Sequence, residues 1–171
     1  MKHKILILII GILTSLFGYG QDNNTASDKI FPEEKFSILE ASLTNGNPVV
    51  GSLNMSYKNY NKKSKYPWCL SISIGLKLEN CKENGLPDAE ESLIANRFED
   101  ELLEKIKGLT TGHYVGHIFN NSFLDFYIYL DDPEKVHKWL QAEINKEGLI
   151  RGFGYEINQD PKWKTVENYL N

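Results

Sequence analysis

The feature that most constrains the fold is a strict alternation of apolar and polar side chains between residues 68 and 79. Six apolar residues share one parity of this run: Trp68, Leu70, Ile72, Ile74, Leu76 and Leu78. Successive side chains of a β-strand point to opposite faces of a sheet, so the pattern predicts a central strand with one buried face. Cys69, Ser71 and Ser73 share the other parity, which predicts a less apolar second face.

Two strand candidates precede this run and one helix candidate follows it. Residues 36–43 and 49–57 are predicted strands, joined by a turn rich in Asn and Gly. After the run, Asp88 is a candidate N-cap, and Glu91 follows at the spacing of a capping box. Apolar residues then recur at helical intervals up to a terminating glycine, which predicts an amphipathic helix over residues 89–107.

The second half of the chain alternates between strands and helices. Its predicted elements are strands at 113–119 and 123–130, a helix from Asp132-Pro133 to Gly148, a strand at 154–158, and a helix that begins at Asp160-Pro161. The complete order is βββαββαβα. This order predicts an α+β fold, with one antiparallel-rich sheet and helices mainly on one face.

From the third strand onward the predicted order βαββαβ is that of a ferredoxin-like core with its split βαβ units. Two strand orders remain open at this point. A meander would pair the second strand with the third. A ferredoxin-like sheet would instead place the last strand beside the third.

The hairpin over residues 113–130 contains the candidate site. A shift of one residue in the pairing moves every side chain to the other face, so the apolar pattern selects the register. Setting Phe119 opposite Phe123 makes one face apolar and places His117 opposite Asp125. The predicted binding residues on the other face are His113, His117, Asp125, Tyr127 and Tyr129.

This polar–aromatic face has two interpretations. A carboxylate beside an imidazole can orient the imidazole as a general base, so His117 and Asp125 are candidates for a ligand-binding patch or half of a catalytic site. The same two residues also make an ordinary cross-strand pair on a solvated face. No serine or cysteine nucleophile can be assigned to the pair from the sequence, so we predict no catalytic residue.

We predict no metal site and no cofactor. Four residues of strand separate His113 from His117 by ~13 Å, which is too far for two ligands of one ion. The chain contains no glycine-rich phosphate loop, nucleophile elbow or calcium-binding loop. The only two cysteines, Cys69 and Cys81, bracket the alternating run. Extended chain would place them on the order of 35 Å apart, so we predict no disulfide.

The N-terminus has the layout of a secretory signal peptide. Two lysines precede an apolar run over residues 5–17, and glycines precede Gln21. We predict a signal peptide over residues 1–20, a flexible leader over 21–35 and a single domain over 36–171. The apolar run is shorter than the ~20 residues of a membrane span, and an uncleaved anchor is the alternative. The protein is therefore predicted to be exported, to the periplasm or the medium, with no membrane span after cleavage.

Charge limits the class of partner. The chain has a formal net charge of −4, and removal of residues 1–20 would leave 17 basic against 23 acidic residues, a net charge of about −6. The longest basic cluster is Lys62-Lys63. Nucleic-acid binding needs a basic surface that this composition does not supply.

Four short segments, taken in order, resemble a known family. They are "YPW" at 66–68, "NGLPDAEE" at 84–91, "FYIYLDDPE" at 126–134 and "DPKW" at 160–163. Together they resemble the bacterial family called domain of unknown function 695, over about residues 36–170. The resemblance implies no activity. Relatives often carry a basic residue where this chain has Leu124, so a role of that residue would be absent here.

We therefore predict an exported, non-catalytic binding or interaction module with an unknown protein or small-molecule partner. The alternative is a small ligand-binding protein or hydrolase-like enzyme that uses the face around His117 and Asp125. A pocket beside these residues, with a nucleophile in reach, would favour the alternative. A third interpretation, a regulator of a nuclease by analogy of fold, conflicts with export.

Overall fold

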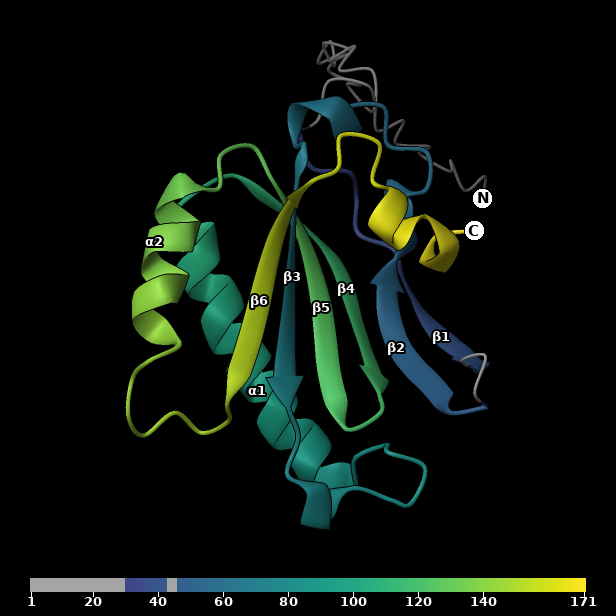
Figure 1. The fold of residues 1–171 in the computed structure, drawn as a ribbon. Coiled ribbons are helices and arrows are strands. Elements are labelled where there is room, and N and C mark those ends of the chain that lie inside the picture. Colours follow the sequence, from purple (N-terminus) through teal and green to yellow (C-terminus); the bar gives the residue numbers. More distant parts are fainter. Residues whose placement is uncertain (1–29, 43–45) are drawn as a thin grey trace, which may run out of the picture.

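The computed structural model of the protein describes residues 30–42 and 46–171 (Figure 1). The predicted signal peptide and residues 21–29 of the predicted leader lie outside the described residues. The fold is α+β, with one open, antiparallel sheet of six strands and a few helices. Among the described residues, no helix combines the length and the apolar character needed to cross a membrane.

The elements follow one another in the predicted order. The strands are β1 (Phe36–Ser42), β2 (Pro48–Asn54), β3 (Trp68–Gly75), β4 (Gly112–Asn120), β5 (Phe123–Leu130) and β6 (Phe153–Gln159). The α-helices are α1 (Ala89–Lys107) and α2 (Glu134–Glu143). Short 3-10 helices are η1 (Met55–Tyr57), η2 (Lys63–Lys65), η3 (Leu78–Asn80) and η4 (Lys164–Tyr169).

Three predicted elements end earlier than expected, and the type of a fourth is wrong. β2 was predicted over residues 49–57 but stops at Asn54, so Tyr57 lies in η1. β3 stops at Gly75, so Leu78 lies in η3 and is 73% exposed instead of facing the core. α2 ends at Glu143 and does not reach Gly148. The terminal segment is the 3-10 helix η4, preceded by Trp163 in a left-handed conformation with φ 58°. A left-handed residue interrupts helical geometry, which explains why no α-helix runs on from Asp160-Pro161.

The strand order is β1-β2-β4-β5-β3-β6. β3 is therefore a central strand, with β5 on one side and β6 on the other, which agrees with its strict alternation. The meander in which the second strand pairs with the third is wrong, because β2 pairs with β4. The chain passes from β2 to β3 through η1 and η2, over one end of the sheet (Figure 1).

Different layers pack on the two faces of the sheet, and the second face is covered only in part. One face packs on α1 and α2, and we call it the helix face. Its main buried residues from β3 and β5 are Leu70, Ile72, Ile74, Leu124, Phe126, Ile128 and Leu130. The other face packs at one end on the 3-10 segments and the C-terminus. Its buried residues include Tyr57, Tyr66, Cys69, Val115, Tyr127, Tyr129, Trp163, Val166 and Leu170.

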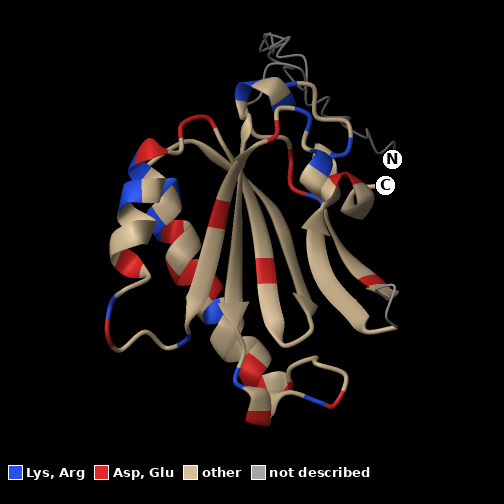
Figure 2. Cartoon of the chain, viewed as in Figure 1, with Lys and Arg blue, Asp and Glu red and all other residues tan. Residues whose placement is uncertain are grey.

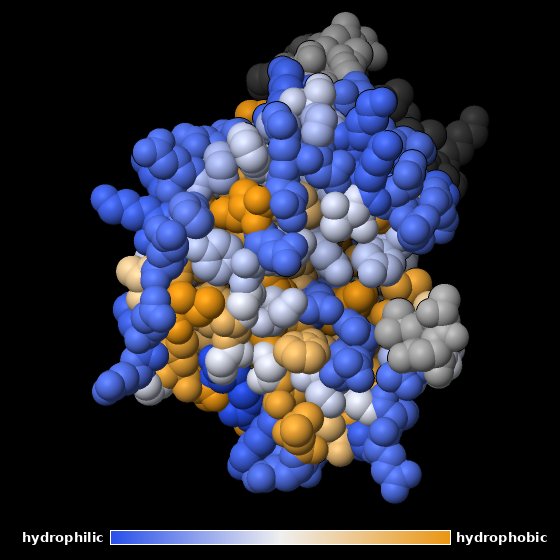
Figure 3. All heavy atoms as spheres, viewed as in Figure 1, coloured by the Kyte–Doolittle hydropathy of each residue, from blue (hydrophilic) through white to orange (hydrophobic). Residues whose placement is uncertain are grey.

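The charged residues lie mainly outside the sheet. In the described part of the chain, no strand contains Lys or Arg, and three strands contain one acid each: Glu40, Asp125 and Glu156 (Figure 2). In the space-filling view from the same side, hydrophobic residues lie in separate areas between hydrophilic ones (Figure 3). The described strands thus carry acidic but no basic side chains.

Candidate functional site

The β4–β5 hairpin does not bring His117 and Asp125 together. His117 pairs with Phe126, and Asp125 pairs with Ile118, so the predicted His117–Asp125 pair is wrong. Directly opposite residues share a face of the sheet. His117 therefore lies on the helix face, whereas Asp125 stays on the other face, and the two cannot act as one acid–base unit.

A turn and a bulge explain the different register. Both residues of the turn at 121–122 have positive φ, 42° and 65°, which is typical of a two-residue hairpin turn. The prediction assumed a loop one residue longer. A β-bulge between Tyr114 and Gly116 then compensates, so that His113 pairs with Tyr129 as predicted. Only the residues between the turn and the bulge change face.

His113, Tyr127 and Tyr129 do share a face, but they do not form a solvated surface. His113 and Tyr129 are fully buried, and Tyr127 is 9% exposed. Trp163 stacks on Tyr129, with ring centroids 4.0 Å apart and an interplanar angle of 11°. The indole Nε1 of Trp163 donates to the carbonyl oxygen of Tyr66 at 3.0 Å. The C-terminal segment is thus held down on the face that the prediction left open.

An aromatic cage encloses His113. Five rings lie within 4.0 to 6.0 Å of its ring, centroid to centroid: Phe31, Tyr57, Tyr60, Tyr66 and Trp163. The Tyr57 hydroxyl lies 3.2 Å from His113 Nδ1. Burial lowers the pKa of His113 to about 4, although the charge of Asp131 partly opposes this. His113 is therefore neutral at pH 7 and shielded from solvent.

His117 belongs to a second network, on the helix face. Its Nδ1 lies 2.8 Å from Glu99 Oε2, and the Tyr114 hydroxyl donates to Glu99 Oε1 at 2.6 Å. Glu99 is only 2% exposed. Burial, and then the charge of Glu99, raise the pKa of Tyr114 far above its usual value. The network therefore gives a buried carboxylate two hydrogen-bonding partners, as burial requires.

Glu99 was not among the predicted site residues; it lies in the acidic run of residues 99–101. A signal was present. Glu99 follows Ala95 by four residues and precedes Leu102 by three, and both are buried. Its position on this apolar stripe predicts burial, and a buried carboxylate needs a partner.

Asp125 lies in a polar hollow on the part of its face that η4 leaves uncovered, which we call the open-face hollow. Ser73 Oγ donates to Asp125 Oδ1 at 2.5 Å, and Asn120 Nδ2 donates to Oδ2 at 2.7 Å. The hollow measures about 540 Å³, and its lining includes Ser71, Ser73, Asp125, Tyr127, Glu156 and Thr165. Two of the five predicted binding residues therefore line one hollow, without an imidazole beside them.

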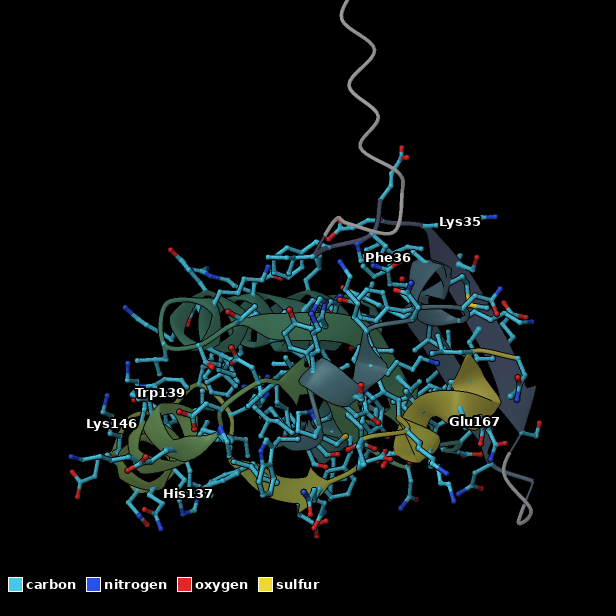
Figure 4. The ribbon with its side chains drawn as sticks, turned by 90° about the horizontal axis from the view of Figure 1, so that it is seen from above. Lys35, Phe36, His137, Trp139, Lys146 and Glu167 are labelled. Atoms are coloured by element: carbon cyan, nitrogen blue, oxygen red, sulfur yellow. The ribbon has the colours of Figure 1, made fainter. Side chains whose placement is uncertain are left out.

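A second cavity, the end pocket, lies where α1 ends and β4 begins. It measures about 450 Å³, and its lining includes Phe31, Glu34, Tyr57, Lys107, Thr111 and Tyr114. Figure 4 looks down on this end of the sheet, where Lys35 and Phe36 mark the entry of the N-terminal segment into β1. Residues of that segment, of η1 and of α1 are far apart in the chain and meet only in the fold.

The end pocket lies between the two histidine networks. Tyr57, which lines the pocket on one side, contacts His113 through its hydroxyl. Tyr114, which also lines the pocket, donates its hydroxyl to Glu99, and this hydroxyl lies 3.2 Å from His117 Nδ1. Such a pocket, apolar with a few charged groups, is the usual form of a small-molecule site. Sequence reasoning did not find it, because Phe31 and Glu34 were assigned to the leader.

The described residues offer no clustered metal ligands. In residues 30–42 and 46–171, no three side chains of His, Cys, Asp or Glu lie close enough to hold one ion. Both thiols are free: Cys69 is buried in β3, and Cys81 is half-buried in an isolated bridge with Pro87.

Comparison with known proteins identifies one family. The sequence model of a family described as "Family of unknown function (DUF695)" matches residues 40–171. Neither the curated proteins nor the solved structures contain a match to the chain. The matched range extends from β1 to the C-terminus and includes most of both networks.

Proposed function

The chain belongs to DUF695, a family of unknown function, and we propose that it is an exported, non-catalytic module that binds a small amphipathic ligand. The end pocket is the proposed binding site. The observation that carries this proposal is its lining, in which the aromatic rings of Tyr57 and Tyr114 lie near the opposite charges of Glu34 and Lys107. Ring surfaces supply contact area, and the charges orient the ligand.

The chemistry of the two histidines supports a non-catalytic role. His113 is fully buried, and its low pKa keeps it neutral, so it does not exchange protons with a substrate at neutral pH. His117 and Asp125 occupy opposite faces of the sheet. We expect the ligand to be uncharged overall. We do not expect a nucleic acid, because the described strands contain no Lys or Arg.

The test is protein-observed NMR mapping of ligand binding on the isotope-labelled mature protein. A fragment library should shift the backbone amide signals of Phe31, Tyr57 and Gly112. Thr111→Trp, which fills the end pocket, should abolish these shifts. Ser71→Trp, which fills the open-face hollow, is the matched control and should leave them unchanged. Shifts confined to Ser71 and Glu156 would reject the end pocket as the site.

Export has a separate test. In cell fractions of its own host, the mature chain should begin at Gln21 and appear outside the cytoplasm. A full-length chain that is found only in the cytoplasm would contradict the exported part of the proposal.

A second candidate function, a hydrolase-like enzyme, rests on one specific observation. Ser52 of β2 lies directly opposite His117 of β4, and Glu99 holds His117 Nδ1. Opposite residues have β-carbons ~4.5–5.5 Å apart, so serine, imidazole and carboxylate follow the order of a nucleophile with its base and orienting acid. A fluorophosphonate probe should then label the wild type but not Ser52→Ala, with Ser73→Ala as control. Absence of labelling would reject this candidate.

A further inference from the structure

We propose that the ligand of the end pocket is a free amino acid with an aromatic or large apolar side chain. Its ammonium group would face Glu34, its carboxylate would face Lys107, and its side chain would lie against the rings of Tyr57 and Tyr114. This inference rests on the proposed function, because it assigns a chemical class to the ligand of that same pocket.

The tyrosine walls offer ring surface rather than free hydroxyl groups. The hydroxyl of Tyr57 is 3.2 Å from His113 Nδ1, and that of Tyr114 donates to Glu99 at 2.6 Å. Both hydroxyls thus already have partners within the fold. Burial raises the pKa of both tyrosines well above the usual range, so the walls stay uncharged at physiological pH. A ligand therefore meets neutral aromatic surface there, which favours an apolar or aromatic side chain.

Two charged side chains of opposite sign complete the lining. Glu34 and Lys107 both line the pocket, and neither forms an ion pair within the described residues. Burial is the largest cause of the raised pKa of Tyr57, Tyr60 is the second, and the negative charge of Glu34 is the third. The Glu34 carboxylate therefore lies near the ring of Tyr57. Both charges are thus available to a ligand that carries the complementary pair.

A ligand with one charge would satisfy only half of this lining. An organic anion would pair with Lys107 but would be repelled by Glu34. An organic cation would pair with Glu34 but would be repelled by Lys107. A zwitterion satisfies both, and the same arrangement discriminates against either single-charge analogue. The pocket volume of about 450 Å³ lies within the range of small-molecule sites.

The decisive experiment is calorimetric titration of the mature protein with L-phenylalanine and two analogues. Phenethylamine lacks the carboxylate, and 3-phenylpropanoate lacks the ammonium group. We expect L-phenylalanine to bind at least about tenfold more tightly than either analogue, because each analogue loses a charge-assisted hydrogen bond and meets an unmatched charge.

Two substitutions separate the two charges. Glu34→Gln should weaken L-phenylalanine binding by about fivefold or more and remove the preference over 3-phenylpropanoate. Lys107→Gln should weaken it by a similar factor and remove the preference over phenethylamine. Glu33→Gln and Lys105→Gln change exposed neighbours of the same charge that do not line the pocket, so they are matched controls and should bind as the wild type does.

The outcomes distinguish this inference from the proposed function. Equal binding of benzyl alcohol, both analogues and L-phenylalanine, all mapped to the end pocket, would overturn the amino-acid class but leave the pocket as the site. Binding of L-phenylalanine that Thr111→Trp does not block would overturn both. The amino-acid class would be supported if Glu34→Gln lost the preference over 3-phenylpropanoate and Lys107→Gln lost the preference over phenethylamine.

Discussion

Glu91 near the start of α1 and Arg151 just before β6 form a two-point ion pair inside the protein. Arg151 Nε donates to Glu91 Oε1 at 2.7 Å, and Nη2 donates to Oε2 at 2.6 Å. The side chain of Glu91 is fully buried. The hydrogen bonds from Arg151 lower the pKa of Glu91 to about 2, against the opposing effect of burial. The pair ties the start of α1 to the loop between α2 and β6.

Arg151→Met should be strongly destabilising, because it leaves the Glu91 carboxylate buried without its cation. We expect a loss of about 3–5 kcal/mol in the free energy of unfolding, measured by urea denaturation followed by circular dichroism. Arg97→Met is the matched control, since the Arg97–Glu101 pair is exposed, with 79% and 58% of the side chains accessible. That variant should lose at most about 0.5 kcal/mol. Equal losses in the two variants would contradict the argument.

Gly116→Ala should also be destabilising, because the bulge of β4 leaves no room for a side chain. Gly116 has φ 140°, and an added Cβ would lie 2.2 Å from the carbonyl oxygen of Ser52. Backbone strain and the clash together predict a loss of about 3 kcal/mol or more by thermal or urea unfolding. Gly154→Ala is the control, since nothing lies within 4 Å of its added Cβ. If Gly116→Ala were as stable as the wild type, the bulge would have to adapt to the added methyl group without cost, which would contradict the prediction.

The order and type of the elements could be predicted because local patterns determine them. The period of two in β3 and the period of 3.6 in α1 are visible in the sequence, and Asp88 caps α1 as predicted, accepting from the Glu91 amide at 2.8 Å. The capping box itself is only half formed, because the Glu91 carboxylate turns to Arg151 instead. The alternation of apolar and polar residues continues to Leu78, although the strand ends at Gly75. Alternation alone does not indicate where a strand ends.

The candidate site was harder to predict, because its geometry depends on non-local and irregular features. A period of two reveals neither the length of a turn nor a bulge, so the two-residue turn and the bulge between Tyr114 and Gly116 place His117 on the helix face without any trace in the pattern. The end pocket needs Glu34 and Lys107, which are far apart in the chain and meet only through packing. Glu99 was not predicted either, although its position on the apolar stripe of α1 indicates burial.

The two cysteines should differ sharply in reactivity. Cys69 is 2% exposed, and burial raises the pKa of its thiol, whereas Cys81 is half-buried at the surface of a loop. We expect a thiol reagent to label one cysteine per native chain and two per denatured chain, with mass spectrometry locating the first label at Cys81. Cys81→Ser should then show no rapid labelling in the native state. Labelling of Cys69 at the same rate as Cys81 would contradict its burial.

His113 should make stability depend on pH between about 4 and 6.5. Its pKa is about 4 in the folded protein, against 6.5 for an exposed histidine. Between these values the unfolded chain binds more protons than the folded one, so stability is fully present above pH 6.5 and falls as the pH drops toward 4. At ~1.36 kcal/mol per pKa unit, the loss is about 3 kcal/mol. Glu91, with its lowered pKa of about 2, contributes a loss only below about pH 4.5, so the window from pH 5 to 6.5 reports on His113.

Urea denaturation at several pH values should show this slope in the wild type and in His137→Gln, a change of an exposed histidine. This slope should be absent in His113→Gln. If His113→Gln does not fold, His113→Leu is the replacement variant, and the slope should be absent there too. A slope that persists in the folded His113 variant would mean that another group carries the pH dependence.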